Sequence, residues 1–207
     1  MAEFWHEELT RASWEMLQEL SKKHEFVLIG GWAVFLWTGR LKSKDIDVVL
    51  DFKTLEKLRQ EFSLVKNERL HKYEVSFEKF DIDIYVPFYS QLALPLDQLR
   101  ATKLQGIRTV SAEELLILKQ GAERARRGSV KARKDAIDVL ALLIYSGLDL
   151  KRYFALLKKH GLADYAEELG KVVKGFDVQD LKYFDMNLKQ FRDWQKEFLA
   201  RLRKSGS

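Results

Sequence analysis

The chain has 207 residues, a formal net charge of +5 and no cysteine. This length favours one large or two small domains, and 46% hydrophobic residues are enough for a buried core. The lack of cysteine excludes a disulfide framework and thiolate metal sites, and it fits a reducing cytoplasm. No apolar run approaches the roughly 18 residues of a membrane span, so we expect a cytoplasmic protein without a membrane partner.

Hydrophobic periodicity divides the first half of the chain into alternating helices and strands. We expect helices over Glu3–Lys23, Trp32–Thr38 and Thr54–Glu61. Strands are expected over Phe26–Ile29, Asp45–Leu50, Tyr73–Phe77 and Phe80–Val86, and a hairpin or bulge is expected over Thr102–Val110. Gly39 can end the second helix.

From Ser111 onward the periodicity is helical throughout. Helices are expected to about Arg127 and over Lys131–Tyr145, Leu150–His160, Leu162–Lys174 and Val178–Arg203. The predicted fold class is α+β, a small mixed β-sheet with flanking helices followed by a C-terminal helical bundle. The predicted domains are 1–110, an α/β domain, and 111–207, a helical domain packed on it.

Carboxylates alternate along two of the predicted strands. Asp45 and Asp47 share one face of the first strand, and Asp81 and Asp83 share one face of a later strand. If that later strand lies beside the first, three carboxylates converge and repel one another unless a cation lies among them. Mg²⁺ prefers such oxygen ligands, and two ions about 3.5–4 Å apart can clamp a phosphoryl centre. We favour Asp83 over Asp81 as the third carboxylate, because Asp81 is nearer the turn.

A glycine pair and a basic turn flank the first carboxylate strand. Gly30 and Gly31 stand between a strand and a helix, where backbone N–H groups can approach a phosphate and the helix dipole favours negative charge. Lys42, Ser43 and Lys44 come directly before Asp45, where they could meet the same polyphosphate. Either feature alone is more commonly an ordinary turn or a solvated edge, and their conjunction favours a phosphoryl-transfer site.

This pattern resembles the polymerase-β-type nucleotidyltransferase superfamily. The matching residues are Ile29-Gly30-Gly31, then thirteen residues, then Asp45-Ile46-Asp47, and later Ile82-Asp83-Ile84. Within the superfamily the chain looks most like the AbiEii-like group, which includes toxin components of toxin–antitoxin systems. The counterparts of that group's motifs are Gly30–Ala33, Arg40–Asp47 and Lys119–Asp138. Gly31 departs from the serine that many members have, so only its backbone can contact phosphate.

The resemblance implies a role for each matching residue. Asp45 and Asp47 would bind two Mg²⁺ ions, with Mn²⁺ as the alternative, and the triphosphate of an NTP. Asp83 would bind one metal ion and help activate the acceptor hydroxyl. Lys119 would neutralise triphosphate charge, and Asp138 stands where the group has a second functional aspartate.

The helical half also has explanations that involve no nucleotide. Lys119 could be an ordinary surface lysine, and Asp138 could pair with Lys134 one turn earlier or with Lys119 or Arg124 on another helix. A basic run could be a solvated connection between helices or could receive a triphosphate or an RNA backbone; its members are Arg124, Arg126, Arg127, Lys131, Arg133 and Lys134.

We therefore expect an enzyme that moves a nucleoside monophosphate from an NTP to a hydroxyl acceptor and releases pyrophosphate. The acceptor could be a protein, an RNA or a small molecule. A toxin role with an antitoxin-like partner protein follows only from the family resemblance. The alternatives are a non-catalytic nucleotide- or RNA-binding module that retains the fold and a protein-interaction subunit that uses the C-terminal helices.

Overall fold

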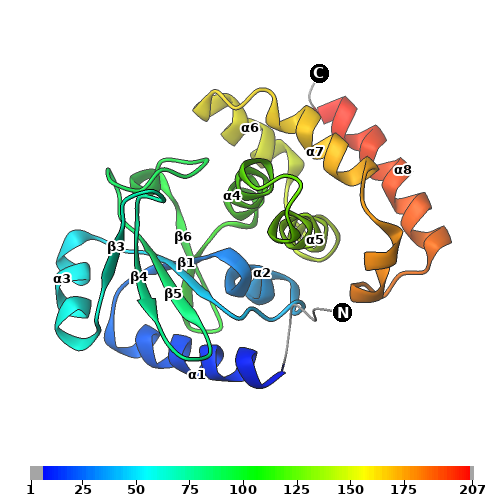
Figure 1. Ribbon diagram of the computed structural model, residues 1–207. Coiled ribbons are helices and arrows are strands. Elements are labelled where there is room, and N and C mark those ends of the chain that lie inside the picture. Colours follow the sequence, from blue (N-terminus) through cyan, green and yellow to red (C-terminus); the bar gives the residue numbers. More distant parts are fainter. Residues whose placement is uncertain (1–6, 206–207) are drawn as a thin grey trace. The chain divides into compact units, whose positions relative to one another are not determined.

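The computed structural model describes residues 7–205 (Figure 1). It divides into two compact units, residues 1–111 and residues 112–207. The expected start of the first helix at Glu3 lies outside the described residues. Among the described residues, no helix is long and apolar enough to cross a membrane.

The first unit is built on a mixed β-sheet. Its elements are, in chain order, α1 (Glu7–Lys23), β1 (Val27–Ile29), α2 (Gly30–Thr38), β2 (Ile46–Val49), α3 (Phe52–Glu61), β3 (Val65–Asn67), β4 (Lys72–Ser76), β5 (Asp81–Tyr85), the 3-10 helix η1 (Leu96–Gln98), β6 (Ala101–Leu104) and β7 (Ile107–Val110). The seven strands are ordered β3-β4-β5-β2-β1-β7-β6. The pairs β2–β5 and β1–β7 are parallel and the other pairs are antiparallel. The predicted α+β class is thereby confirmed.

Alternation of side chains gives the central strands one buried face. Ile46 and Val48 of β2 and Ile82 and Ile84 of β5 are almost completely buried. The residues between them in the sequence are only partly buried, so the carboxylates of these strands lie on the opposite face. The apolar side chains of these strands therefore face the core on one side of the sheet, and their acidic side chains lie partly buried on the other side.

Tryptophan side chains join α1 to α2. The rings of Trp14 and Trp32 lie with centroids 4.8 Å apart, and the Trp32 Nε1–H donates to Ser13 Oγ at 3.1 Å. The helix α2 begins at Gly30, two residues before the predicted start, and it ends at Gly39, whose φ of 68° is left-handed. These contacts fix α2, whose first turn begins directly after β1.

The second unit is entirely helical within the described residues. Its elements are α4 (Ala112–Ala125), α5 (Val130–Tyr145), α6 (Leu150–His160), α7 (Tyr165–Lys174), the 3-10 helix η2 (Val178–Tyr183) and α8 (Leu188–Ser205). Helices α4 and α5 lie side by side, and α7 runs along α8 (Figure 1). The expectation that this unit packs on the first stays a prediction.

One predicted helix of the second unit is wrong. The sequence predicts a continuous helix over Val178–Arg203, whereas the chain is extended at Phe184 and α8 begins only at Leu188. The buried Phe184 ring stacks on Tyr145 with centroids 6.1 Å apart, which draws the chain out of helical geometry. Asn187 and Gln190 then exchange side-chain-to-backbone hydrogen bonds of 2.8 and 3.0 Å, which is a capping box that starts α8.

Candidate active site

Three acidic residues form a row across three neighbouring strands of the first unit. Asp47 of β2 lies directly opposite Asp83 of β5, and Asp83 lies opposite Glu74 of β4. Residues in register on adjacent strands point to the same face of a sheet, and in an antiparallel pair such as β4–β5 their Cβ atoms are about 4.5–5.5 Å apart. The sheet therefore brings together two of the predicted carboxylates and adds a third acid that the sequence analysis did not single out.

Gly30 lies directly against the Asp47 side chain at the start of α2. A Cβ atom added to Gly30 would lie 2.0 Å from Asp47 Oδ2 and 2.5 Å from its Cγ, and the φ of Gly30 is +68°. Within the described residues, the first turn of α2 has no side-chain cap at Ile29 and no acidic residue of its own. The helix dipole favours a negative charge at this end of α2, and the Asp47 side chain lies beside its first residue.

Lys72 supplies a positive charge inside the acidic row. Its Nζ lies 2.6 Å from Asp83 Oδ2 and 2.8 Å from Glu74 Oε1, and its side chain is only 10% exposed. Burial and the charge of Asp47 raise the pKa of Asp83 to about 6, although Lys72 opposes this increase. Burial alone would lower the pKa of Lys72, but the hydrogen bonds to Asp83 and Glu74 raise it above its usual value.

Asp45 lies just outside β2, and its side chain points along the sheet. Its Oδ1 accepts a 3.2 Å hydrogen bond from the backbone N–H of Asp81. Asp81 thus neighbours Asp45, whereas Asp83 neighbours Asp47. This register supports Asp83 as the partner of Asp47 on the next strand.

In the part of the chain that the structure describes, a complete metal-binding cluster is not preformed. Among residues 7–205, no three His, Cys, Asp or Glu side chains are grouped so that they could hold a metal ion by themselves. Asp47 and Asp83 offer adjacent carboxylate oxygens of the kind that Mg²⁺ and Mn²⁺ prefer. A metal ion there would draw further oxygen ligands from Asp45 after rotation of its side chain, from a bound phosphate or from water.

The basic turn before β2 consists of two exposed lysines on either side of a buried serine. Lys42 and Lys44 are both exposed, and Lys42 lines a pocket of about 290 Å³ with Trp14 and Phe35. Ser43 is buried, and its carbonyl accepts a 3.1 Å hydrogen bond from Ser13 Oγ of α1. The loop is therefore anchored at Ser43 and presents the two lysines. Contact of these three residues with a nucleotide stays a prediction.

Lys119 and Asp138 are joined to each other within the helical unit. Lys119 Nζ of α4 lies 2.6 Å from Asp138 Oδ2 of α5, and the two side chains are 8% and 0% exposed. Lys119 also lies 3.4 Å from Asp135, which Arg126 contacts at 2.7 Å. The cross-helix partner is therefore closer than Lys134, which is 3.8 Å from Asp138. The nucleotide contacts implied for Lys119 and Asp138 stay predictions.

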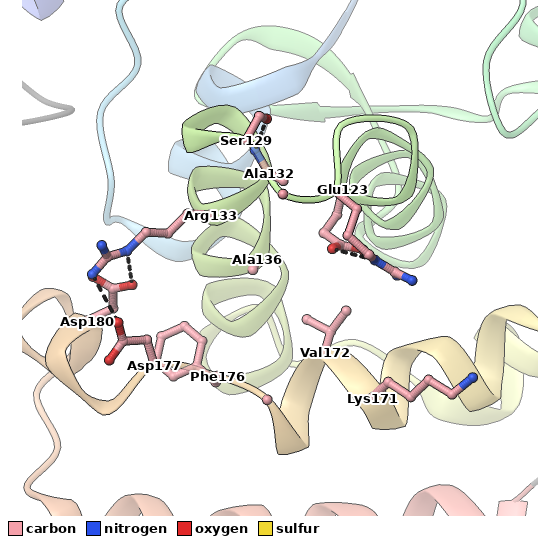
Figure 2. Close-up of a pocket in the computed structure, with 13 residues that line it drawn as sticks. Glu123, Ser129, Ala132, Arg133, Ala136, Lys171, Val172, Phe176, Asp177 and Asp180 are labelled. Atoms are coloured by element: carbon pink, nitrogen blue, oxygen red, sulfur yellow. Dashed lines mark hydrogen bonds and ion pairs between the residues drawn. The ribbon is translucent and has the colours of Figure 1, made fainter.

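The basic run of the helical unit is largely neutralised by nearby acids. Five of its six members form ion pairs within this unit; they are Arg124, Arg126, Arg127, Arg133 and Lys134. Arg133 donates to both oxygens of the buried Asp180, at 2.8 and 2.9 Å, beside a pocket of about 520 Å³ (Figure 2). Arg127 bridges Glu123 and Glu168 at the same pocket. These pairs hold the helices together and leave less positive charge for a polyanion than the sequence suggests.

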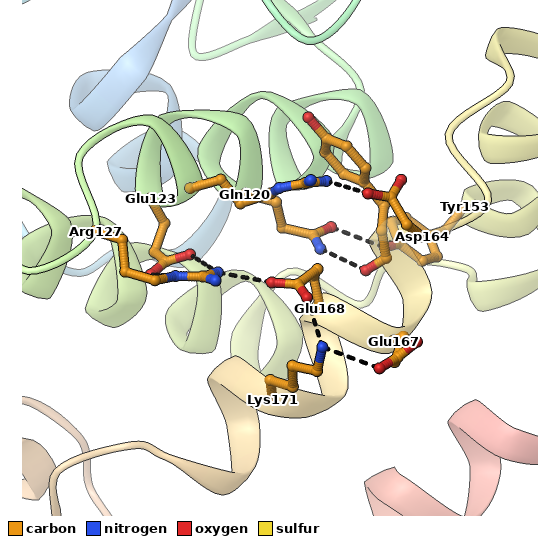
Figure 3. Close-up of polar contacts among 10 residues, drawn as sticks. Gln120, Glu123, Arg127, Tyr153, Asp164, Glu167, Glu168 and Lys171 are labelled. Carbon is orange, nitrogen blue, oxygen red and sulfur yellow. Dashed lines mark hydrogen bonds and ion pairs between the residues drawn. The ribbon is translucent and has the colours of Figure 1, made fainter.

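A polar network links α4 to α6 and α7 (Figure 3). The Tyr153 hydroxyl donates to Gln120 Oε1 at 2.8 Å, and Gln120 Nε2 donates to the carbonyl of Tyr165 at 2.9 Å. Burial raises the pKa of the Tyr153 hydroxyl, which therefore stays protonated as a donor. The network is fully buried at Tyr153 and Gln120, and it stabilises the bundle.

Sequence reasoning missed Lys72 and Glu74. The predicted strand covers Tyr73–Phe77, so it leaves out Lys72 and includes Glu74 without a role. The signal was available in the alternation of Lys72, Glu74 and Ser76 with the apolar Tyr73 and Val75. Their pairing with Asp83 depends on the register of β4 against β5, which the residue pattern alone does not determine.

The sequence matches no protein-family model and no curated protein. Among solved structures, the chain is similar to the Helicobacter pylori protein JHP933, with 15% identity over 96% of this chain and 90% of that one and a TM-score of 0.48. It is also similar to an antigenic nucleotidyltransferase-like protein from Paracoccidioides brasiliensis, with 18% identity over 78% of this chain and 91% of that one and a TM-score of 0.41. A third is the Megavirus polyadenylate synthase, with 12% identity over 76% of this chain and 38% of that one and a TM-score of 0.47. These likenesses are distant and concern the fold, and the AbiEii-like subgroup stays a hypothesis.

Proposed function

We propose that the protein is a nucleotidyltransferase that moves a nucleoside monophosphate from an NTP to a hydroxyl acceptor and releases pyrophosphate. The observation that carries the proposal is the position of the Asp47 side chain, which lies where a side chain at Gly30 would begin, with Asp83 in register beside Asp47. A helix N-terminus of the kind that can bind phosphate and a carboxylate pair of the kind that can bind a cation are thereby adjacent. Nucleotidyl transfer requires both of them in one place.

The N-terminus of α2 is the proposed triphosphate site. Gly30 and Gly31 carry no side chain that would keep phosphate oxygens from the backbone, and the helix dipole favours the charge of a phosphate. Lys42 and Lys44 stand on the loop that leads to Asp45 and would add positive charge there, with Ser43 between them. Lys119 and Asp138 are further candidates for nucleotide contact on the strength of the resemblance.

Asp45, Asp47 and Asp83 are the residues that would hold Mg²⁺, or Mn²⁺ in its place. Burial and, after it, the charge of Asp47 raise the pKa of Asp83, so part of this increase reflects repulsion between the two carboxylates in the protein alone. A cation bound there would relieve this repulsion, so the residues fit the ion. Bound Mg²⁺ would polarise the phosphoryl oxygens and neutralise triphosphate charge.

Asp83 is the proposed acceptor of the proton. The oxygen of the acceptor hydroxyl attacks the α-phosphorus, and its proton passes to an Asp83 carboxylate oxygen. The bond between the α-phosphorus and the bridging oxygen breaks, and pyrophosphate leaves with that electron pair. A carboxylate with a pKa near 6 is largely deprotonated at neutral pH and is a stronger base than an ordinary aspartate.

Transfer of label from NTPs tests this function. Each of the four NTPs, labelled at the α-phosphate, is incubated with Mg²⁺ and with protein, RNA and small-molecule acceptors. Wild type should label an acceptor, whereas Asp47→Asn should lower transfer at least about a hundredfold, because it removes a charge that acts in the transition state. Asp97→Asn, a change at an exposed aspartate in η1, is the matched control and should keep full activity. Equal transfer by Asp47→Asn and wild type would refute the assignment.

The acceptor and the biological role are finer proposals. A toxin role rests on the AbiEii-like resemblance and includes an antitoxin-like protein partner. Induction of the wild-type gene should then arrest growth, and induction of Asp47→Asn should not. Growth unaffected by the wild-type protein would remove the toxin role and leave nucleotidyl transfer standing.

A further inference from the structure

Lys72 lies between two acids of the row, Glu74 and Asp83, whose negative charges would otherwise need another cation. Glu74, Asp83 and Asp47 lie in register on β4, β5 and β2, so three negative charges meet on one face of the sheet. The Lys72 ammonium bridges the first two of them, at 2.8 Å from Glu74 and 2.6 Å from Asp83. Its largely buried side chain is held in this position by the strand that carries it.

We propose that Lys72 takes the place of the divalent ion on the acceptor side, so that the active site binds one Mg²⁺ per nucleotide instead of two. This inference rests on the proposed nucleotidyltransferase function and deepens it. The single ion would be held by Asp45 and Asp47 next to α2, so Asp83 would give up the metal-binding role proposed above and keep its role as the proton acceptor. On the other side, the single positive charge of Lys72 would neutralise Asp83 in place of the second ion.

The contacts of Lys72 explain why a second ion would be excluded. A bridging ion between Asp47 and Asp83 needs oxygens from both carboxylates, and Lys72 already holds Asp83 Oδ2. Two cations close together repel each other, and this repulsion is stronger at a partly buried site than in bulk water. Lys72 cannot move away easily, because Glu74 holds it from the other side and is itself bound by Asn67 Nδ2 at 3.0 Å.

The remaining Asp83 oxygen keeps its part in the reaction. The contact of Lys72 is with Oδ2, so Asp83 Oδ1 can take the proton of the attacking hydroxyl. The Lys72 ammonium beside it can stabilise the negative charge that develops on the attacking oxygen. Lys72 thus combines two tasks, holding Asp83 in position and neutralising charge, which a metal ion would otherwise perform.

The number of bound Mn²⁺ ions tests this inference without any turnover. The protein is saturated with Mn²⁺ and an α,β-methylene NTP analogue, each of the four bases being tried. Native mass spectrometry counts ions per protein–nucleotide complex, and electron paramagnetic resonance detects the spin coupling of two ions about 3.5–4 Å apart. Wild type should hold one uncoupled Mn²⁺.

Three variants separate the charge of Lys72 from general effects. Lys72→Met keeps most of the length of the side chain and removes the charge, so it should admit a second, spin-coupled Mn²⁺. Lys72→Arg keeps the charge and should hold one ion. Lys66→Met removes a lysine of β3 that pairs with Glu68 at 2.6 Å, away from the acidic row, and should also hold one ion.

Each outcome decides between the proposals. Two spin-coupled Mn²⁺ ions in wild type would overturn the inference, and this result does not depend on whether Lys72→Met folds. A single Mn²⁺ ion in folded Lys72→Met would also overturn it. In either case the analogue still binds with Mn²⁺, so the proposed function survives. Absence of metal-dependent nucleotide binding in wild type would instead refute the proposed function, and the inference with it.

Discussion

Replacement of Gly30 by alanine tests the contact on which the site depends. The new Cβ would lie 2.0 Å from Asp47 Oδ2, 2.5 Å from Cγ and 2.7 Å from Cβ. Ordinary contacts between such atoms begin at about 3.5 Å, so the Asp47 side chain must move by roughly 1 Å or more. The left-handed φ of +68° adds a backbone penalty for any residue with a Cβ.

The two contributions can be measured separately. Gly39 has the same φ of +68°, but no atom lies within 4 Å of the position that an added Cβ would take. Gly39→Ala should therefore lower the free energy of unfolding by the backbone penalty alone, about 1–2 kcal/mol. Gly30→Ala should add about 1–3 kcal/mol of overpacking, for a total of about 2–5 kcal/mol.

Urea denaturation followed by circular dichroism measures both variants. Transfer of labelled nucleotide should be abolished in Gly30→Ala, because Asp47 is displaced, and should persist in Gly39→Ala. If the two variants lose the same stability and keep the same activity, Asp47 does not pack on Gly30 and the proposed site loses its foundation.

Three further predictions concern buried groups. Lys119→Met should lower the free energy of unfolding by about 3–5 kcal/mol, because it leaves the fully buried Asp138 without its nearest partner; a loss below about 1 kcal/mol in urea titration would contradict this. Without divalent ions, the free energy of unfolding should fall as the pH rises from about 4 through 6. The pKa of Asp83 is about 6 in the folded protein and near 3.9 in the unfolded chain. The folded state therefore binds the proton more tightly, and the stability that this proton contributes is lost as Asp83 ionises. Asp83→Asn should lack this part of the pH dependence, and identical profiles for variant and wild type would refute it. Tyr153→Phe should cost about 1–2 kcal/mol by leaving the buried Gln120 Oε1 without its donor, and an unchanged thermal midpoint would refute that role.

Local patterns in the sequence were sufficient for much of the fold. The alternation around Asp47 and Asp83 predicted β2 and β5 and their acidic face, because side-chain period is a local property. Gly39 correctly predicted the end of α2, because the left-handed backbone at the end of a helix favours glycine whatever the rest of the fold is. The strand β3 was missed because Val65–Asn67 is a short edge strand whose exposed residues have no apolar alternation.

The candidate site was harder to predict because it depends on register between strands. The sequence placed Asp83 on a hydrophobic strand, but the position of Glu74 across from it follows from the β4–β5 pairing. Lys72 enters the site from the first residue of β4, where strand boundaries are least certain from sequence. The break before α8 similarly depends on the long-range stacking of Phe184 on Tyr145.

The ion pair of Lys72 has a consequence for the order in which the sheet assembles. Strands β4 and β5 form a local hairpin, whereas parallel pairing of β2 with β5 must close a long loop that contains α3, β3 and β4. Loop closure of this kind is slow, so we expect the hairpin to form first. Lys72 would then already neutralise Asp83 when β2 brings Asp47 alongside. The lysine thereby lowers an electrostatic barrier to folding at the step that completes the centre of the sheet.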